Sequence, residues 1–202
     1  MSETFVPAQT RWAIEWRGEE EALMAIEPTE AEIADAASDL AAYYNDAHNR
    51  QMMAHEGEPF TASGVVTYYR ELREEGGRPF LFQRAGVLVG DGDLRNIEDG
   101  AAEIAIMIGG RAVQGRGLGT RYAIMLHVFA FRVIGLERVF ISVIPANTAS
   151  RRLFEKLGYE IDDSPEAREL IDDETDVTLS ISRARFEGTA SASVSQIRIS
   201  ER

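Results

Sequence analysis

Two features of the chain carry residues that could do chemistry: a glycine-rich segment and a carboxylate inside an apolar stretch. The glycine-rich segment, residues 114–120, reads Gln-Gly-Arg-Gly-Leu-Gly-Thr and separates an apolar stretch at 102–108 from a longer one at 118–133. The first stretch is short and predicts a β-strand, whereas helical spacing of apolar residues in the second predicts a helix that ends at Gly135. Main-chain N–H groups at the start of a helix bind anions, and glycines let a phosphate approach closely. The segment therefore predicts a site for a phosphorylated ligand.

The spacing of these glycines does not fit two common phosphate-binding motifs. A P-loop has Lys followed by Ser or Thr after its last glycine, but Thr120 and Arg121 stand there in this chain. The dinucleotide fingerprint G-x-G-x-x-G would require a third glycine where Thr120 stands. A P-loop and a dehydrogenase are therefore excluded.

The segment does match the pattern Q/R-x-x-G-x-G, in which Gln114 is followed by Gly117 and Gly119. Through this motif the chain resembles the GNAT superfamily of acetyl-coenzyme A-dependent N-acyltransferases. A second motif at residues 147–159, N-T-A-S-R-R-L-F-E-K-L-G-Y, is similar to the N-x-x-S-x-x-x-x-E-K-L-G-F/Y signature of the branch that contains the ribosomal-protein alanine acetyltransferases. Two motifs in this order make the resemblance specific, and it covers residues 20–186.

The resemblance implies an α/β fold of the α+β type. Its central sheet would be mixed but mostly antiparallel, with about seven strands, about four flanking helices and a splay between the fourth and fifth strands. We expect residues 1–19 to form an N-terminal extension that could add a strand, and residues 20–186 to form the acetyltransferase domain. Residues 187–202 are rich in Ser and Ala and predict a mobile tail, with an added strand or a swapped arm as the alternative.

The resemblance also implies where acetyl-coenzyme A binds. Main-chain N–H groups of residues 115–120 would hold the diphosphate, with the side chains of Arg116 and Arg121 beside it. The pantetheine arm would pair with residues 107–109 like an added strand, and the oxyanion donor would be a main-chain N–H near Met107 or Ile108. The predicted coenzyme-binding residues are Met107, Ile108, Gly109, Gln114, Gly115, Arg116, Gly117, Leu118, Gly119, Thr120, Arg121 and Asn147.

Glu103 is the predicted general base. A free aliphatic amine has a pKa near ~10 and is mostly protonated at neutral pH, so acyl transfer to it needs a base. On the predicted strand Glu103 shares a side with Ala105 and Met107, and desolvation there would raise its pKa. In several members of the resembled family a glutamate at this place acts directly or through water. An ion pair with a neighbouring strand is the alternative.

The general acid is the point at which the chain departs from the family pattern. Many members have a tyrosine in the last helix that protonates the leaving thiolate, but Phe154 stands at that position and has no proton to give. In the resembled branch a serine at the place of Ser150 has been given this role. Ser150 is therefore the predicted acid, with water as the alternative, and Asn147 is the predicted N-cap of this last helix.

Two helices are predicted before the central strands. Thr29 and Glu32 form a capping box for the first, and the polar residues 45–60 predict a loop between the two. The aromatic residues of this region are typical of a core. The resemblance implies that these helices wall the acceptor pocket, so one or two of the aromatics would contact substrate. These aromatics are Tyr43, Tyr44, Phe60, Tyr68 and Tyr69.

Asp91 and Asp93 alternate with glycine in a way that could suggest calcium. An EF-hand loop would require glycine at Asn96 and glutamate at Ala102, so we exclude that site. The glycines beside the two aspartates instead indicate a bulge or a bend in the sheet.

No metal site is predicted, because His48 and His55 lack metal-ligand spacing and His127 lies within an apolar helix. The chain has no cysteine, which excludes disulfides and a covalent cysteine mechanism. The N-terminus is acidic, and no apolar run is long enough to cross a membrane. We therefore expect a cytoplasmic protein with no membrane partner.

Charge is distributed unevenly. Residues 1–60 carry a net charge of −10, whereas residues 111–156 carry +6 within a chain whose total is −13. The basic block coincides with the predicted phosphate site, and the acidic remainder argues against nucleic acid as a partner. Seven acidic residues at 162–174 are typical of a solvated loop, or of an entrance that attracts cations.

The leading functional hypothesis is an N-acetyltransferase that moves an acetyl group from acetyl-coenzyme A directly to a primary amine. The expected acceptor is cationic, either a small amine or a protein N-terminus, and a homodimer is left open. The alternative is a non-catalytic acyl-coenzyme A-binding or interaction module on the same fold.

Overall fold

The computed structural model describes residues 10–18, 22–169 and 175–202. Nine described strands form one sheet in the order β7-β8-β6-β5-β4-β3-β2-β1-β9. Their bounds are β1 Trp12–Arg17, β2 Ala22–Ile26, β3 Arg78–Arg84, β4 Val87–Glu98, β5 Ala101–Ile108, β6 Arg138–Val143, β7 Glu160–Ile161, β8 Val177–Ser182 and β9 Ile197–Glu201. All neighbouring strands are antiparallel except β5 and β6, so the predicted mixed, mostly antiparallel sheet is confirmed.

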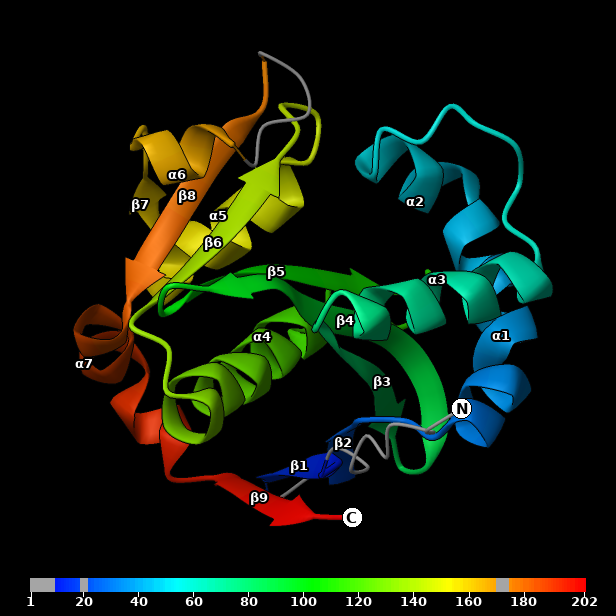
Figure 1. The fold of residues 1–202 in the computed structure, drawn as a ribbon, viewed down its shortest axis with the longest axis horizontal. Helices are drawn as coiled ribbons and strands as arrows, with labels where there is room; N and C mark the ends of the chain where they lie inside the picture. Colours follow the sequence, from blue (N-terminus) through cyan, green and yellow to red (C-terminus); the bar gives the residue numbers. More distant parts are fainter. Residues whose placement is uncertain (1–9, 19–21, 170–174) are drawn as a thin grey trace, which may run out of the picture.

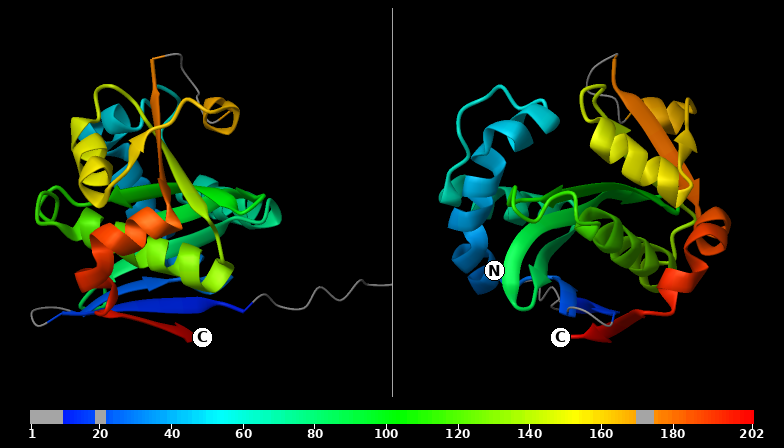
Figure 2. Two further views of the ribbon diagram at one scale, coloured as in Figure 1. Left: turned by 90° about the vertical axis from the view of Figure 1, so that its left-hand side faces the viewer. Right: turned by 180° about the vertical axis from the view of Figure 1, so that it is seen from behind.

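The helices lie on both faces of this sheet (Figure 1). Their bounds are α1 Glu30–Asn45, α2 Ala47–Met52, α3 Ala62–Glu74, α4 Leu118–Phe129, α5 Thr148–Leu157, α6 Pro165–Arg168 and α7 Arg183–Val194, with a π-helical turn at Ala130–Ile134 after α4. The sheet curves around α4, whereas α1 and α3 lie on its outer face (Figure 2). The described part therefore has more strands and helices than predicted, because the ends of the chain add β1, α7 and β9 and the domain itself contains the short helices α2 and α6.

Two hydrophobic clusters correspond to these two layers. The larger one surrounds α4, whose side chains Tyr122, Met125 and Phe129 are fully buried, and it includes residues of most of the strands. The smaller one joins α1 and α3 to the outer face of the sheet through Leu40 and Tyr69, among others. The β4–β5 pair thus has a cluster on each side.

Local sequence signals explain where α1 begins and where β4 bends. Thr29 Oγ1 accepts a hydrogen bond from the N–H of Glu32, whose carboxylate accepts one from the N–H of Thr29, so the predicted capping box is confirmed. Pairing of β3 with β4 shifts register between Phe82 and Gln83, opposite Gly90. The predicted irregularity of the sheet at this glycine is therefore also confirmed.

The sheet opens between β5 and β6. These strands pair only at their first residues, from Ala101 opposite Arg138 to Glu103 opposite Phe140. Beyond Glu103, β6 pairs with β8 alone, and α5, β6 and β8 diverge from β5 (Figure 1). Counted within the seven-strand core of the family pattern, this is the splay predicted between the fourth and fifth strands.

The structure differs from the sequence-based expectation in two segments. Residues 187–202 were expected as a mobile tail, with an added strand as one alternative. They form most of α7 and the strand β9, which pairs with β1, so the alternative of an added strand is the one observed. The anticipated loop at 45–60 contains the short helix α2, which begins because the Asp46 carboxylate accepts hydrogen bonds from the N–H groups of His48 and Asn49. The predicted boundary at residue 186 therefore falls inside a helix.

Parts of other predicted segments lie outside the described residues. These are residues 1–9 and 19 of the expected N-terminal extension and residues 170–174 of the acid-rich segment. The described remainder of the extension forms β1, an internal strand between β2 and β9. Within the described chain, no helix combines the length and the apolar character needed to span a membrane.

Candidate active site

The glycine-rich segment forms the turn that leads from the end of β5 into α4. Gly117 is the N-cap of α4 in the left-handed conformation, with φ 77°, and no side chain caps the helix. Among the described residues, none of the N–H groups of residues 115–120 meets a hydrogen-bond acceptor, and the first bond of the helix runs from Arg121 N–H to Gly117 O. A run of uncapped N–H groups at a helix start is the arrangement that binds a phosphate. The residues predicted to hold the diphosphate therefore fit that ligand.

Gly119 fits the start of α4 against its neighbours. A Cβ atom added at this position would lie 3.0 Å from Leu153 Cδ1 in α5 and 3.8 Å from Ile108 Cγ1 in β5. The contact with Leu153 is tighter than ordinary van der Waals packing, so a larger residue would require the Leu153 side chain to shift by a few tenths of an ångström. Glycine here keeps the N–H groups of the turn beside the opening of the sheet.

Gln114 joins three elements through its side chain. Its Nε2 donates hydrogen bonds to Ile108 O at the end of β5, at 2.7 Å, and to Asn49 Oδ1 in α2, at 2.9 Å. Asn49 in turn donates to Gly109 O at 3.0 Å. The side chain that the family motif places first therefore positions the turn relative to β5 and α2, while its role toward coenzyme stays a prediction.

The end of β5 presents main-chain groups to the opening. The N–H of Gly109 donates to Val89 O in β4 at 2.8 Å, so the main-chain groups of Gly109 and Met107 face β4. Because the direction alternates along a strand, the N–H of Ile108 faces the side of β6, where no strand pairs with it. Of the two predicted oxyanion donors, Met107 and Ile108, the strand geometry therefore favours Ile108.

Asn147 and Ser150 lie at the start of α5. Asn147 Oδ1 accepts the N–H of Ser150 at 3.0 Å and so caps the helix, as predicted, while its Nδ2 donates to Met52 O at 3.1 Å. Asn147 thus joins α5 to the end of α2 across the opening of the sheet. Its predicted hydrogen bond to pantetheine and the predicted acid role of Ser150 stay predictions.

Phe154 is buried where a tyrosine acid was sought. Its ring packs edge-on against Tyr159, with centroids 5.0 Å apart. The hydroxyl of Tyr159 does not replace the missing acid, because it is buried and bonded to His127 Nε2 at 2.5 Å. The structure therefore leaves Ser150 and water as the candidate acids.

Arg116 and Arg121 lie on the glycine-rich turn and on the first turn of α4. Arg116 is exposed and Arg121 half-buried, and neither makes an ion pair with a described residue. Two guanidinium groups beside uncapped helix N–H groups would favour an anion.

Glu103 lies at the last paired position before the sheet opens. It is half-buried, it stands opposite Arg95 of β4, and its carboxylate accepts a bond from Asn96 Nδ2 at 3.3 Å. Arg95 is close enough for the two charges to influence each other. The structure thus combines both alternatives for Glu103, since the residue lies at the opening and also near a cation on the neighbouring strand.

A polar network that the sequence did not predict lies beside Glu103. Asp91 and Asp93 of β4 are buried on the face toward α1 and α3, with 6% and 5% of their surface exposed. Asp93 pairs with Arg95, whose Nε lies 2.7 Å from Oδ1 and whose second nitrogen lies 2.8 Å from Oδ2. Asp91 instead accepts hydrogen bonds from two tyrosine hydroxyls, those of Tyr44 and Tyr69. Alternation along the strand was the available signal, because it places both aspartates on one face.

Ser142 of β6 is a second residue that the sequence analysis missed. Its Oγ is fully buried and has no hydrogen-bond partner among the described residues. Ser142 lies two residues beyond Phe140, the last residue of β6 that pairs with β5, so it flanks the opening. A lone serine within an apolar strand gives no sequence signal of this kind.

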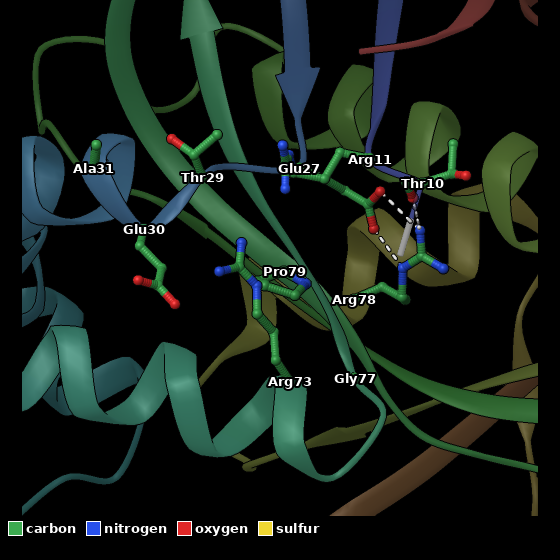
Figure 3. Close-up of a pocket in the computed structure, with 10 residues that line it drawn as sticks. All are labelled: Thr10, Arg11, Glu27, Thr29, Glu30, Ala31, Arg73, Gly77, Arg78 and Pro79. Carbon is green, nitrogen blue, oxygen red and sulfur yellow. Dashed lines mark hydrogen bonds and ion pairs between the residues drawn. The ribbon is translucent and has the colours of Figure 1, made fainter. Parts of the chain in front are cut away.

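A cavity of about 590 Å³ lies elsewhere, between the start of β1, the β2–α1 connection, the end of α3 and the start of β3 (Figure 3). No predicted site residue lines it. Within it Glu27 pairs with Arg78, and Arg73 donates to Pro28 O. Glu27 and Arg78 satisfy each other, and none of the predicted catalytic residues lies here, so the catalytic interpretation rests on the opening of the sheet and not on this cavity.

The chain is also similar to known acetyltransferases. Residues 29–160 match the family described as acetyltransferase (GNAT) domain. The chain belongs to the GNAT acetyltransferase family. The predicted family and enzyme class are therefore confirmed. A comparison with curated proteins gives no significant match.

Several solved structures share the fold of this GNAT protein. Mycobacterium smegmatis RimJ in complex with CoA-disulfide has a TM-score of 0.73 and 16% identity, over 92% of this chain and 96% of that one. Aminoglycoside acetyltransferase AAC(6')-Ib in complex with coenzyme A and kanamycin has a TM-score of 0.65 and 19% identity, over 83% of this chain and 98% of that one. A domain from Methanocaldococcus jannaschii has a TM-score of 0.65 and 16% identity, over 81% and 99%. Identities this low establish the fold alone.

Metal ligands do not gather in the part of the chain that the structure describes. No group of three or more His, Cys, Asp or Glu residues there could hold an ion. The chemistry assigned to the site below uses protein side chains and main-chain groups.

Proposed function

We propose that this GNAT protein transfers an acetyl group from acetyl-coenzyme A directly to a primary amine in a ternary complex. The observation that carries the proposal is the run of uncapped N–H groups at residues 115–120, placed where β5 leaves β6. Coenzyme A complexes of RimJ and AAC(6')-Ib, which share the fold, support the choice of cosubstrate.

Each element of the site has a role in this proposal. The bound thioester supplies an activated acetyl group. The N–H groups of residues 115–120 hold the diphosphate, with Arg116 and Arg121 beside it. The end of β5, residues 107–109, aligns the pantetheine arm, and the N–H of Ile108 stabilises negative charge on the acyl oxygen.

Glu103 is the proposed general base. Its carboxylate lies where the sheet opens, on the same face as Met107, and it accepts a proton directly or through water. Ser150 at the start of α5 is the proposed donor of a proton to the departing thiolate. Because Phe154 cannot donate a proton, this second assignment depends on Ser150 or on water.

The acceptor is proposed to be a cationic primary amine, either a small amine or a protein N-terminus. From Glu103 to the end of β5, the outer face of the β4–β5 pair carries three carboxylates against one guanidinium, a surplus of negative charge that favours an ammonium group. The carboxylates belong to Asp91, Asp93 and Glu103, and the guanidinium to Arg95. AAC(6')-Ib, on the same fold, has been solved with kanamycin, which shows that the fold can receive an amine-bearing ligand.

Steady-state kinetics of Glu103→Gln test the base. The substitution is expected to lower kcat about 100-fold or more, while coenzyme A affinity measured by calorimetry stays within about twofold. Arg70→Gln on the exposed side of α3 is a matched control, because Arg70 makes only a long surface ion pair with Glu74. Unchanged turnover in Glu103→Gln would remove Glu103 from this role.

Ser150→Ala tests the acid in the same assay. A fall in kcat without a change in coenzyme affinity would support a proton donor at Ser150, and unaltered kinetics would leave that role to water. The rival function, a non-catalytic acyl-coenzyme A-binding module, is supported by the loss of the tyrosine at Phe154. A screen of primary amines in which the wild-type protein binds acetyl-coenzyme A but acetylates none of them would favour this rival.

A further inference from the structure

Asp91 stands at the level of the predicted reaction centre. In the β4–β5 register it lies directly opposite Met107, whereas Glu103 lies four residues earlier on β5. Strand residues advance by about 3.3 Å each, so the two carboxyl-bearing positions are separated along the sheet by roughly 13 Å. Directly opposed residues of an antiparallel pair point to the same face. Asp91 is therefore the acidic residue of β4 nearest to the end of β5 where the acyl group is expected.

The carboxyl group of Asp91 is fixed through one oxygen only. Tyr44 of α1 and Tyr69 of α3 both donate their hydroxyl hydrogens to Oδ2, the latter at 2.7 Å. No described residue bonds to Oδ1. Among the described residues, the fully buried side-chain oxygen without a partner is Ser142 Oγ, so Oδ1 of Asp91 keeps some contact with solvent. One oxygen thus holds the group in place, and the other can meet a ligand.

The surroundings of Asp91 bring the pKa of its carboxyl group close to neutral pH, so that both its protonated and its ionised form can be populated. Burial raises its pKa to about 7, the hydroxyls of Tyr44 and Tyr69 lower it, nearby Asp93 raises it and Arg95 lowers it. Burial likewise raises the pKa of the two tyrosines well above the usual value, so both remain protonated hydrogen-bond donors. A carboxylate of this kind is a stronger base than an ordinary aspartate.

Asp93 shows what a purely structural aspartate looks like in the same strand. Both of its oxygens are engaged by the guanidinium of Arg95, and Tyr68 donates a further bond to Oδ2 at 3.2 Å. Asp91 has no cationic partner among the described residues and one oxygen without a partner. A buried carboxylate left in that state is costly for stability, which favours a role in binding or catalysis.

We propose that Asp91 is a second catalytic carboxylate, whose Oδ1 takes the first of the two protons that an ammonium acceptor must lose. This inference rests on the function proposed above. The first N–H bond breaks with transfer of its proton to Asp91, which leaves a neutral amine. The nitrogen lone pair then forms the bond to the acetyl carbon as the carbon–sulfur bond breaks. The second proton reaches Glu103 through water, because the position of Glu103 lies roughly 13 Å along the sheet from that of Asp91, and the thiolate is protonated from Ser150 or water. One carboxylate serves each proton.

Asp91→Asn is the direct test, because the side chain keeps its shape and loses its basicity. We expect kcat/KM for a primary amine to fall about 100-fold and its rise with pH, centred near the pKa of Asp91, to disappear. Calorimetric affinity for coenzyme A should not change. Glu103→Gln should also be slower but should keep that rise. Asp91→Asn with kcat/KM within about threefold of the wild type and with the rise retained would overturn the inference.

A pair of tyrosine variants tests the proposal even if Asp91→Asn fails to fold. Tyr69→Phe removes one hydrogen bond to the ionised carboxylate, so the rise of kcat/KM should move to higher pH by about one unit. Tyr68→Phe is the matched control, because that hydroxyl donates to Asp93, and its profile should stay in place. A profile that does not move in Tyr69→Phe would contradict the role of Asp91.

The two levels of the proposal fail in different ways. A wild-type protein that binds acetyl-coenzyme A but acetylates no amine would overturn the proposed function, and the role of Asp91 with it. An active wild type whose pH profile follows Glu103 instead of Asp91 would overturn only the inference about Asp91.

Discussion

The two faces of the β4–β5 pair are built in opposite ways. On the inner face Leu94 and Ile104 are buried against the cluster around α4, which is apolar apart from a few satisfied groups. On the outer face, Asp91 and Asp93 of the same strand β4 are buried beneath the tyrosines of α1 and α3. Because side chains alternate along a strand, one pair of strands supplies both faces. The inner face stabilises the fold, and the outer face holds charges that a stable core would avoid.

His127 sharpens this contrast, because it is a buried titratable residue on the inner side. Its Nδ1–H donates to Ala123 O at 2.6 Å, and its Nε2 accepts the hydroxyl of Tyr159 at 2.5 Å. Burial lowers its pKa to about 4, so it remains neutral near pH 7. Both nitrogens of His127 have partners, whereas one oxygen of Asp91 has none among the described residues. A fully bonded buried group indicates structure, and a partly bonded one indicates function.

The largest effect is expected from a cavity on the inner face. Phe129 is fully buried and packs edge-on against Phe80 at 5.1 Å. Phe129→Ala should lower the free energy of unfolding by about 3–5 kcal/mol, measured by urea denaturation. Val87→Ala is the control, since Val87 is 66% exposed and should change stability by less than about 0.5 kcal/mol. Equal losses of unfolding free energy in the two variants would contradict the claim that the cluster around α4 stabilises the fold.

A smaller effect on the free energy of unfolding is expected from the ionisation of Asp91 and His127, and its pH dependence is opposite for the two residues. The folded protein holds a proton on Asp91 up to a pKa of about 7, above the ordinary value of 3.8, so its contribution to stability falls as pH rises through that interval. His127 has a folded pKa of about 4, below its ordinary 6.5, so its contribution falls as pH decreases from 6.5 toward 4.

Asp91→Asn isolates the outer-face contribution. The free energy of unfolding of the variant, relative to the wild type, should rise by on the order of 3 kcal/mol between about pH 4 and about pH 8, because one pKa unit corresponds to about 1.4 kcal/mol. Urea unfolding at several pH values measures this difference. A difference that does not change with pH would show that Asp91 titrates normally.

The smallest effect is expected from the hydroxyl of Tyr159. Tyr159→Phe leaves His127 Nε2 buried without a partner, which should cost about 1–3 kcal/mol of unfolding free energy. Because Tyr159 belongs to the inner face and has no proposed role in acceptor binding, kcat/KM of the folded variant should stay within about twofold of the wild-type value. A strong loss of activity in the folded variant would mean that the inner face also takes part in catalysis.

The sequence was sufficient for those parts of the fold that depend on local signals. The capping box at Thr29, the N-cap at Asn147 and the turn from 114 to 120 all depend on residues within a few positions of one another. The ends of the chain were harder to predict, because β9 is a strand only through its pairing with β1, some 180 residues earlier. Pairing across such a distance leaves little local pattern.

The candidate site likewise has one part that depends on a local motif and one part that depends on residues far apart in the chain. Apart from Asn147, the predicted coenzyme side is one continuous segment, residues 107–121, so its residues could be predicted from a single motif. The proposed acceptor side gathers Tyr44, Tyr69 and Asp91 from three separate elements, and only the folded chain brings them together. The spacing of Asp91 and Asp93 indicated that both lie on one face of a strand. Whether Asp91 has a cationic partner depends on how α1 and α3 pack on that face, which the sequence does not show.

The central claim is that the N–H groups of residues 115–120 hold the diphosphate of coenzyme A. The most direct measurement compares, by calorimetry, the affinity of the protein for acetyl-coenzyme A and for acetyl-pantetheine, which keeps the thioester but lacks the diphosphate and the 3′-phosphoadenosine attached to it. We predict that acetyl-pantetheine binds at least about 100-fold more weakly, because two or more charge-assisted hydrogen bonds are lost. Equal affinities for the two thioesters would contradict the claim.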